Sequence, residues 1–108
     1  MKYLFIALTF LICVSCSKDE PVDISKGLET KFHQFRASDP CDGSSIEEYN
    51  FQGQTVYLLQ NTCCCDYYSD VVDNKGNLLG HLGGFEGNSE INGEEFSNAI
   101  FIRTVWSK

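Results

Sequence analysis

Apolar residues are unevenly distributed along the chain, and the first group of them forms one uninterrupted run. Residues 3–14 carry no charge, and Lys2 precedes them. The run is shorter than the roughly 20 apolar residues that a membrane-spanning helix needs. A positive charge, a short apolar run and a small residue before Cys16 are together typical of a secretory signal. We therefore predict a signal peptide over residues 1–15 and export of the remainder.

The residues around the predicted cleavage site point to a lipid anchor. Cys13-Val14-Ser15-Cys16 resembles a bacterial lipobox, although Cys13 stands where such boxes usually carry leucine. Ser17-Lys18-Asp19-Glu20 resembles the export tag that sends Bacteroidota lipoproteins to the outer face of the outer membrane. These resemblances imply that Cys16 carries fatty acids such as palmitate, and that residues 16–23 form a tether to the outer membrane on the cell exterior. An ordinary cleaved signal and a generic polar tether are the alternatives.

Beyond the tether, apolar residues recur at helical spacing. Ile24, Leu28, Phe32 and Phe35 lie three or four positions apart, which places them on one face of a helix over residues 25–36. We expect this face to be buried. Candidate capping and terminating residues flank the helix: Asp23 or Ser25 before it and Ser38-Asp39-Pro40 after it.

After the helix, the spacing of apolar residues changes to alternate positions, which is typical of β-strands. Gln52-Gly53 and residues 73–76 have the composition of tight turns between strands. The predicted strands cover residues 46–51, 55–60, 67–73, 77–82 and 99–106.

One helix before several consecutive strands predicts an α+β fold for a single globular domain over residues 24–108. We expect one N-terminal helix packed on a small antiparallel β-meander of four to five strands, with the opposite face in contact with water. The helix would pack on one of two alternating sets in the second strand, and the sequence leaves the choice open: Val56 with Leu58, or Tyr57 with Leu59. The last strand is expected to present one set of side chains on the same side: Ile100, Ile102, Thr104 and Trp106.

The charge of the chain argues against one class of partner. The sequence has 8 Lys and Arg against 15 Asp and Glu, for a net charge of −7, and loss of Lys2 with the signal makes it −8. Because phosphate backbones bind to basic patches, we expect no nucleic acid partner. A cationic partner or simple solubility suits this charge better. Whether a protein or a small molecule binds is left open, as is the oligomeric state.

The cysteines that remain after export are expected to form disulfides. Besides Cys41 the mature domain has the triplet Cys63, Cys64 and Cys65, and an exported protein meets an oxidising environment. If Gln52-Gly53 is a two-residue hairpin turn, the register carried outward sets Cys41 opposite Cys64. A turn one residue longer or shorter would instead select Cys63 or Cys65.

A metal site is the alternative interpretation of the same cysteines. Consecutive residues of an extended segment point in opposite directions, so only Cys63 and Cys65 could point together, with His81 as a further ligand. The Cys-x2-Cys spacing of zinc sites and of thioredoxin-like enzymes is missing. We therefore expect no metal, no other cofactor and no catalytic residue, and we interpret His33 as a surface or boundary residue.

Three glycines in five residues mark the strongest candidate for a binding loop. Gly83-Gly84-Phe85-Glu86-Gly87 is too rich in glycine for a strand, and it lacks the Gly-x-x-x-x-Gly-Lys pattern of a phosphate-binding loop. Phe85 would be exposed at its centre. A recognition loop and a flexible connection are the two interpretations.

The order of these features resembles a family of small Bacteroidota lipoproteins of unknown function. The family pattern is an aromatic strand ending in Cys-Cys-Asp, a Gly-Asn hairpin, a Gly-Gly-x-x-Gly loop and a C-terminal Trp. Its counterparts here span roughly residues 28–108. Members tend to carry a cysteine where this chain has Gly80, and Cys63 is additional here. The resemblance implies that Cys64 or Cys65 is the structural partner of Cys41 and leaves Cys63 as the extra thiol. The matching segments are Ile46-Glu47-Glu48-Tyr49, Gln52-Gly53-Gln54-Thr55-Val56-Tyr57, Cys64-Cys65-Asp66, Asp73-Asn74-Lys75-Gly76-Asn77-Leu78, residues 83–87 and Thr104-Val105-Trp106.

Three functional hypotheses follow from the sequence. The first is a small binding or interaction module displayed on the cell envelope, because the chain combines aromatic strands and a glycine loop without a catalytic motif. The second is a thiol- or metal-dependent enzyme that uses the cysteines of residues 63–65. The third is an envelope structural or inhibitory protein, which the sequence does not distinguish from the first.

Overall fold

The computed structural model describes residues 25–63 and 67–108. The predicted signal peptide, Cys16 and the tether lie outside the described residues, as do Cys64 and Cys65. Within the part of the chain that is described, no helix is long and apolar enough to cross a membrane.

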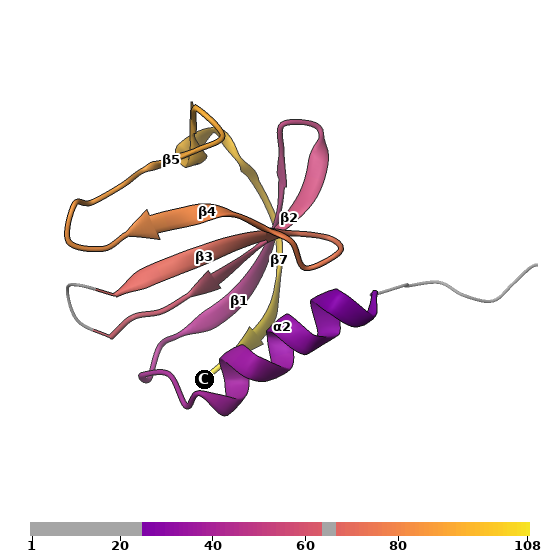
Figure 1. The fold of residues 1–108 in the computed structure, drawn as a ribbon, viewed down its shortest axis with the longest axis vertical. Coiled ribbons are helices and arrows are strands. Elements are labelled where there is room, and N and C mark those ends of the chain that lie inside the picture. Colours follow the sequence, from indigo (N-terminus) through magenta and orange to yellow (C-terminus); the bar gives the residue numbers. More distant parts are fainter. Residues whose placement is uncertain (1–24, 64–66) are drawn as a thin grey trace, which may run out of the picture.

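One helix packs on an antiparallel five-stranded sheet, which confirms the predicted α+β fold (Figure 1). The strand order is β4-β3-β2-β1-β7, so the first four strands form a meander and β7 pairs beside β1. A two-stranded sheet and one 3-10 helix, none of them predicted, lie between β4 and β7. The elements are α2 (Lys26–Ala37), β1 (Ser45–Phe51), β2 (Gln54–Gln60), β3 (Tyr68–Asp73), β4 (Leu78–Gly83), β5 (Glu90–Ile91), β6 (Glu94–Glu95), η1 (Phe96–Asn98) and β7 (Ile100–Ser107).

The β1–β2 hairpin has the predicted two-residue turn. Gln52 and Gly53 both have positive φ, of 54° and 77°, as a type I′ turn requires. Phe51 pairs with Gln54, and the same register continues along both strands as far as residues 45 and 60. The sequence therefore predicted this register correctly.

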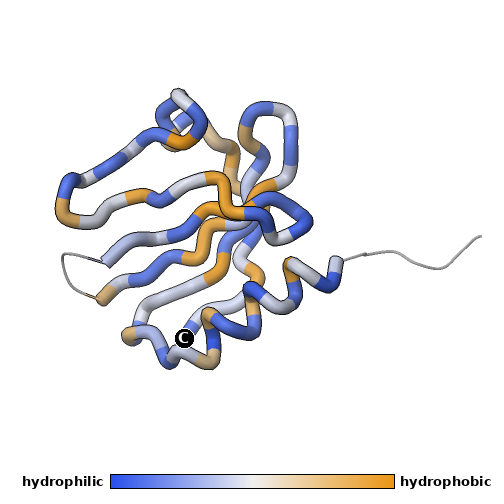
Figure 2. The backbone as a smooth tube through the Cα atoms, viewed as in Figure 1, coloured by the Kyte–Doolittle hydropathy of each residue, from blue (hydrophilic) through white to orange (hydrophobic). Residues whose placement is uncertain are grey.

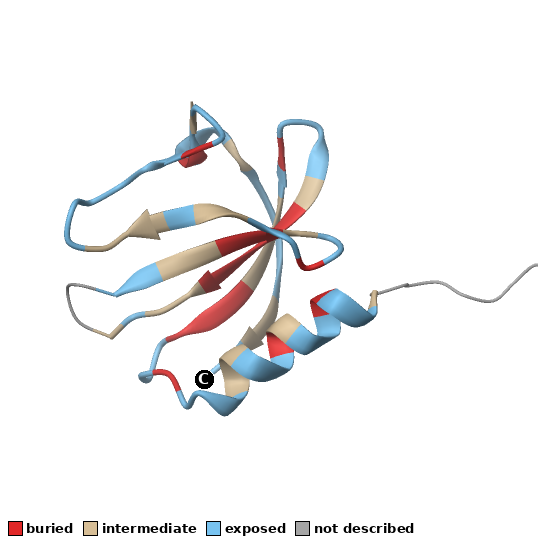
Figure 3. Ribbon diagram, viewed as in Figure 1, coloured by how far each residue is buried: buried red, intermediate tan, exposed pale blue. Residues whose placement is uncertain are grey.

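Helix α2 covers one face of the sheet, and hydrophobic, buried positions alternate along it with hydrophilic, exposed ones (Figures 2 and 3). Its apolar side chains settle the choice that the sequence left open. Ser25 caps the helix by accepting a hydrogen bond from the Leu28 backbone N–H at 3.2 Å. The ring of Phe32 lies edge-on to that of Tyr57, with centroids 5.3 Å apart. The buried core on this face contains Leu28, Phe32, Ile46, Tyr57, Leu59 and Val72.

The opposite face of the sheet is not left to water, which corrects the prediction. The chain leaves β4 at one edge of the sheet and reaches β7 at the other, and the segment between them places Ile91 and Phe96 on this face. Both are buried, because together with the sheet they close a second apolar core. The sheet residues of this core are Phe51, Val56, Leu58 and Val71.

The prediction that β7 shows one alternating set on one side is wrong, because β7 has two irregularities. Trp106 pairs with Ile46 and Thr104 with Glu47, so one extra residue lies between them on β7. Ile46 and Glu47 point to opposite faces, and therefore Trp106 and Thr104 do as well. A second irregularity between residues 101 and 103 leaves Ile102 as the extra residue.

Candidate functional site

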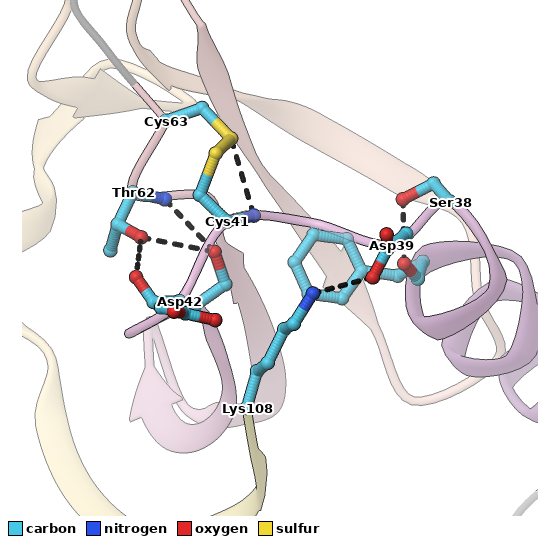
Figure 4. Close-up of polar contacts among 9 residues, drawn as sticks. Ser38, Asp39, Cys41, Asp42, Thr62, Cys63 and Lys108 are labelled. Atoms are coloured by element: carbon cyan, nitrogen blue, oxygen red, sulfur yellow. Dashed lines mark hydrogen bonds and ion pairs between the residues drawn. A yellow bond between two sulfur atoms is a disulfide. The ribbon is translucent and has the colours of Figure 1, made fainter.

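A disulfide joins the chain before β1 to the chain after β2, and its partner differs from the prediction. Cys41 is bonded to Cys63, with Cα atoms 5.2 Å apart, and not to Cys64 (Figure 4). The register of the hairpin stops at Ser45, because a turn at residues 41–44 replaces the strand that the extrapolation assumed. The resemblance-based assignment of Cys63 as the extra thiol is also wrong, because Cys63 is the cysteine bonded to Cys41.

Hydrogen bonds hold the two segments beside this bridge together. Ser44 Oγ accepts from the Thr62 backbone N–H at 3.1 Å, and Thr62 Oγ1 donates to the Asp42 carbonyl at 2.8 Å. Lys108 Nζ contacts the Asp39 carboxylate, and the hydrogen bond from Lys108 lowers the pKa of Asp39 (Figure 4). The bridge is therefore part of a rigid structural corner.

The most chemically distinctive pair of side chains joins the neighbouring strands β3 and β4. Asp70 pairs directly with His81 in the register, so both side chains lie on the sheet face that carries α2. His81 Nδ1 is 2.7 Å from Asp70 Oδ1, and each side chain is 44% exposed. A carboxylate at Nδ1 fixes the orientation of the imidazole and leaves Nε2 available to a ligand.

Tyr68 extends this pair into an exposed surface. Its ring stacks beside the imidazole of His81, with centroids 4.8 Å apart and a tilt of 39°. A side-chain carbon at Gly84 would collide with the Tyr68 ring, so the glycine leaves the space in which that ring lies. We call Tyr68, Asp70, His81 and Gly84 the His81 face.

The predicted glycine loop projects next to the His81 face. Gly83 belongs to β4 rather than to the loop, which is a correction of one residue. The backbone groups of Gly83 and Asn88 exchange hydrogen bonds of 2.8 and 3.1 Å and close the loop. Asn88 Nδ2 also donates to the His81 carbonyl at 2.6 Å. Phe85 is 84% exposed at the tip, as predicted.

A cleft between α2 and the sheet meets the same face at Asp70. Its volume is about 240 Å³. The helix contributes a cation, an amide and a hydroxyl, and the sheet contributes an apolar floor and the Asp70 carboxylate. A ligand in the cleft could therefore contact polar groups of both signs. The lining residues are Lys31, Gln34, Phe35, Ser38, Leu59 and Asp70.

The candidate metal ligands are not brought together. Cys63 is in the disulfide, Cys65 lies outside the described residues, and His81 is bonded to Asp70. Across residues 25–63 and 67–108, no group of three His, Cys, Asp or Glu side chains is close enough to share a metal ion. His33 is exposed on α2, as predicted.

Sequence reasoning considered His81 only as a possible metal ligand and missed its contact with Asp70. Val72 pairs with Leu78 after the 73–77 turn, and that register alone would set His81 opposite Ser69. A shift of one residue between Val71 and Val72 moves His81 to Asp70. No local sequence signal marks this shift.

The fold and the site define a class: a small α+β domain with an Asp–His pair beside a cleft and an exposed glycine loop. Residues 32–108 match the family model described as a domain of unknown function (DUF6970), and the chain belongs to this family. No curated protein and no solved structure matches the chain. Glycine at position 80 has a local explanation, because a side-chain carbon there would lie 2.9 Å from Ile91 Cδ1.

Proposed function

We propose that this chain is an exported lipoprotein, anchored through Cys16 to the outer membrane, whose domain is a small binding module facing the cell exterior. The His81 face, the glycine loop and the cleft form its binding surface. The observation that carries this proposal is the convergence of an oriented imidazole, an exposed tyrosine ring and a mixed polar cleft at Asp70.

The site supports binding better than covalent catalysis. In the described part of the chain, the His81 ring has one hydrogen bond, to Asp70, and no hydroxyl or thiol is bonded to it. Nucleophilic catalysis needs such a group within hydrogen-bond reach of the base. The thiol-enzyme hypothesis also loses Cys63, which is in the bridge to Cys41.

The anchor is tested by fatty-acid labelling. Cys16→Ser should give an uncleaved precursor without lipid, because serine lacks the thiol that carries the lipid. Without several acyl chains the protein should no longer be held stably on the membrane. Equal labelling of variant and wild type would contradict the anchor. Protease added to intact cells should degrade the wild-type protein, and replacing Lys18-Asp19-Glu20 with alanines should protect it.

The binding surface is tested on residues 16–108 with Cys16→Ser, produced without the signal peptide and called the mature Cys16→Ser chain. Its ¹⁵N NMR spectrum would be recorded with soluble oligosaccharides, amino acids and short peptides as probes. Probes that bind should shift signals of Tyr68, His81 and Lys31, and Tyr68→Ala should weaken the shifts, whereas the exposed control His33→Ala should not. Shifts centred on another surface, or no binding of any probe, would contradict the proposal.

A further inference from the structure

The two edges of the sheet differ in how far they are covered. At the β4 edge, β5 packs against β4, the Gly83–Asn88 bridge lies at its end, and Ile91 fits against Gly80. Strand β7 pairs with β1 on one side, and no described strand pairs with its other side. An edge strand of this kind presents backbone donors and acceptors that another strand can use.

Three consecutive apolar side chains are exposed at the start of this open edge. Ile100, Phe101 and Ile102 are 65%, 52% and 50% exposed. The ring of Phe101 packs edge-on to Tyr49, with centroids 5.6 Å apart, which holds this segment in place. The apolar edge is therefore a fixed part of the sheet.

Charge distinguishes β7 from the rest of this acidic protein. The strand has no carboxylate, and Arg103 Nε is 2.7 Å from Glu48 Oε1 of β1. A basic partner strand could form no ion pair with β7, because β7 has no acidic residue. An acidic partner strand would have to compete with Glu48 for Arg103. The edge thus fits an apolar strand without an unpaired charge. Strand β7 is itself such a strand, because Glu48 pairs with its single charged residue, Arg103.

From these observations we infer that β7 is the pairing edge for a second copy of this chain, with the two β7 strands antiparallel about a two-fold axis near Ile102. Such an interface is isologous, because the same residues contribute from both copies. Ile102 is the extra residue of an irregularity, so its backbone groups are left without a partner on β1.

The association should be concentration-dependent and should strengthen with salt. Two irregularities bend β7 and shorten the stretch that can pair, which limits affinity. Without the signal peptide each copy has a net charge of −8, from 7 Lys and Arg against 15 Asp and Glu, and salt screens the repulsion between the copies. A complex held by opposite charges would weaken with salt instead.

Sedimentation equilibrium of the mature Cys16→Ser chain tests the inference. The wild-type mass should rise toward that of a dimer with concentration. Ile102→Glu and Ile102→Lys should each raise the dissociation constant at least about tenfold, because like charges would face each other across the axis. An equimolar mixture of the two variants should recover the dimer, because opposite charges then meet.

Leu78→Glu is the matched control, because Leu78 is 47% exposed on the opposite edge strand and receives the same charge. It should dimerise like the wild type. A wild-type chain that stays monomeric at all concentrations would overturn the inference and leave β7 to a strand of a different protein. A mixture of the Glu and Lys variants that stays monomeric, or a monomeric Leu78→Glu variant, would also overturn it.

Discussion

At the scale of single residues, two glycines of one loop differ only in what surrounds them. Gly84 and Gly87 both have positive φ, of 81° and 66°, so alanine at either position is strained. A side-chain carbon at Gly84 would also collide with Tyr68, whereas nothing lies within 4 Å of one at Gly87. The pair therefore separates backbone strain from the role of Gly84 in holding the tyrosine ring.

We expect Gly87→Ala to lower the free energy of unfolding by about 1–2 kcal/mol. Gly84→Ala should cost at least about 1 kcal/mol more, because the Tyr68 ring must move. Urea unfolding measures both variants, and the imidazole NMR signals of His81 should shift only in Gly84→Ala. Equal losses in the two variants would mean that Gly84 serves only the turn.

Asp73 organises the β3–β4 turn and makes stability depend on pH. Its carboxylate accepts hydrogen bonds from the backbone N–H groups of Lys75, at 2.8 Å, and Asn77, at 2.9 Å. Burial alone would raise the pKa of Asp73, but these hydrogen bonds outweigh it and the pKa is lowered. The stabilisation is therefore present above the ordinary aspartate pKa of about 3.9 and is lost as pH falls through the lowered value.

Asp73→Ala should reduce the free energy of unfolding at pH 7 by about 1–2 kcal/mol. The difference from wild type should shrink below about pH 4, where the wild-type carboxylate takes up its proton. Asp73→Asn keeps an acceptor oxygen that does not titrate, so its difference from Asp73→Ala should be the same at both pH values. Denaturant unfolding at pH 7 and pH 3 measures these differences, and a pH-independent wild-type advantage over Asp73→Ala would contradict the assignment.

At the scale of elements, the first turn of α2 meets the β3–β4 turn backbone to backbone. A side-chain carbon at Gly27 would lie 2.5 Å from the Lys75 carbonyl oxygen, and one at Gly76 would lie 2.6 Å from the Gly27 carbonyl oxygen. Ser25 Oγ also donates to the Asn74 carbonyl at 3.3 Å. Glycine is a weak helix former, and this close contact explains its position in the first turn of α2.

Gly27→Ala should lower the free energy of unfolding, whereas helix propensity alone predicts that it raises it. In an isolated helix the change would stabilise by about 1 kcal/mol. Here we expect a net loss of about 1–2 kcal/mol, because overpacking at the Lys75 carbonyl is larger than that gain. Thermal unfolding measures it, with His33→Ala on the exposed side of α2 as the neutral control. A higher melting temperature for Gly27→Ala would show that α2 is not docked on this turn.

The elements that the sequence predicted are those specified by local patterns. Helix α2 follows from residues at helical spacing, and the β1–β2 register follows from Gln52-Gly53. The irregularities of β7 arise only when that strand pairs with β1, some fifty residues away, and no window of sequence contains both. The Asp70–His81 contact was missed for the same kind of reason, since a one-residue shift decides it.

At the scale of the whole molecule, the disulfide closes a long segment that contains the central hairpin. Cys41 and Cys63 are 22 residues apart, for which the chain-entropy estimate is about 3–3.5 kcal/mol. Such a loss is large for a small domain. Cys41→Ser should lower the free energy of unfolding by roughly this amount.

Cys63→Ser should cause the same loss as Cys41→Ser, and the double variant should lose no more than either single one. Denaturant titration of oxidised protein measures the losses, and peptide mapping without reduction identifies the bridge. A Cys63→Ser variant that keeps the wild-type stability would mean that another cysteine bonds to Cys41.

The placement of β7 beside β1 also determines the order in which the domain can fold. The meander is built from strands that follow one another in sequence, whereas Ser45 pairs with Ser107 only after the whole intervening chain has been brought back across the sheet. The β1–β7 ladder therefore has a high contact order. Closing so large a loop costs conformational entropy, which makes this step slow. During refolding, amide protons of β1 and β2 bonded to each other should become protected from exchange before those that join β1 to β7. Until that last step β1 is itself an open edge, and it carries residues on both faces that are buried in the folded domain, such as Ile46 and Phe51. A chain in which β7 has not yet paired is therefore the species most prone to misassembly.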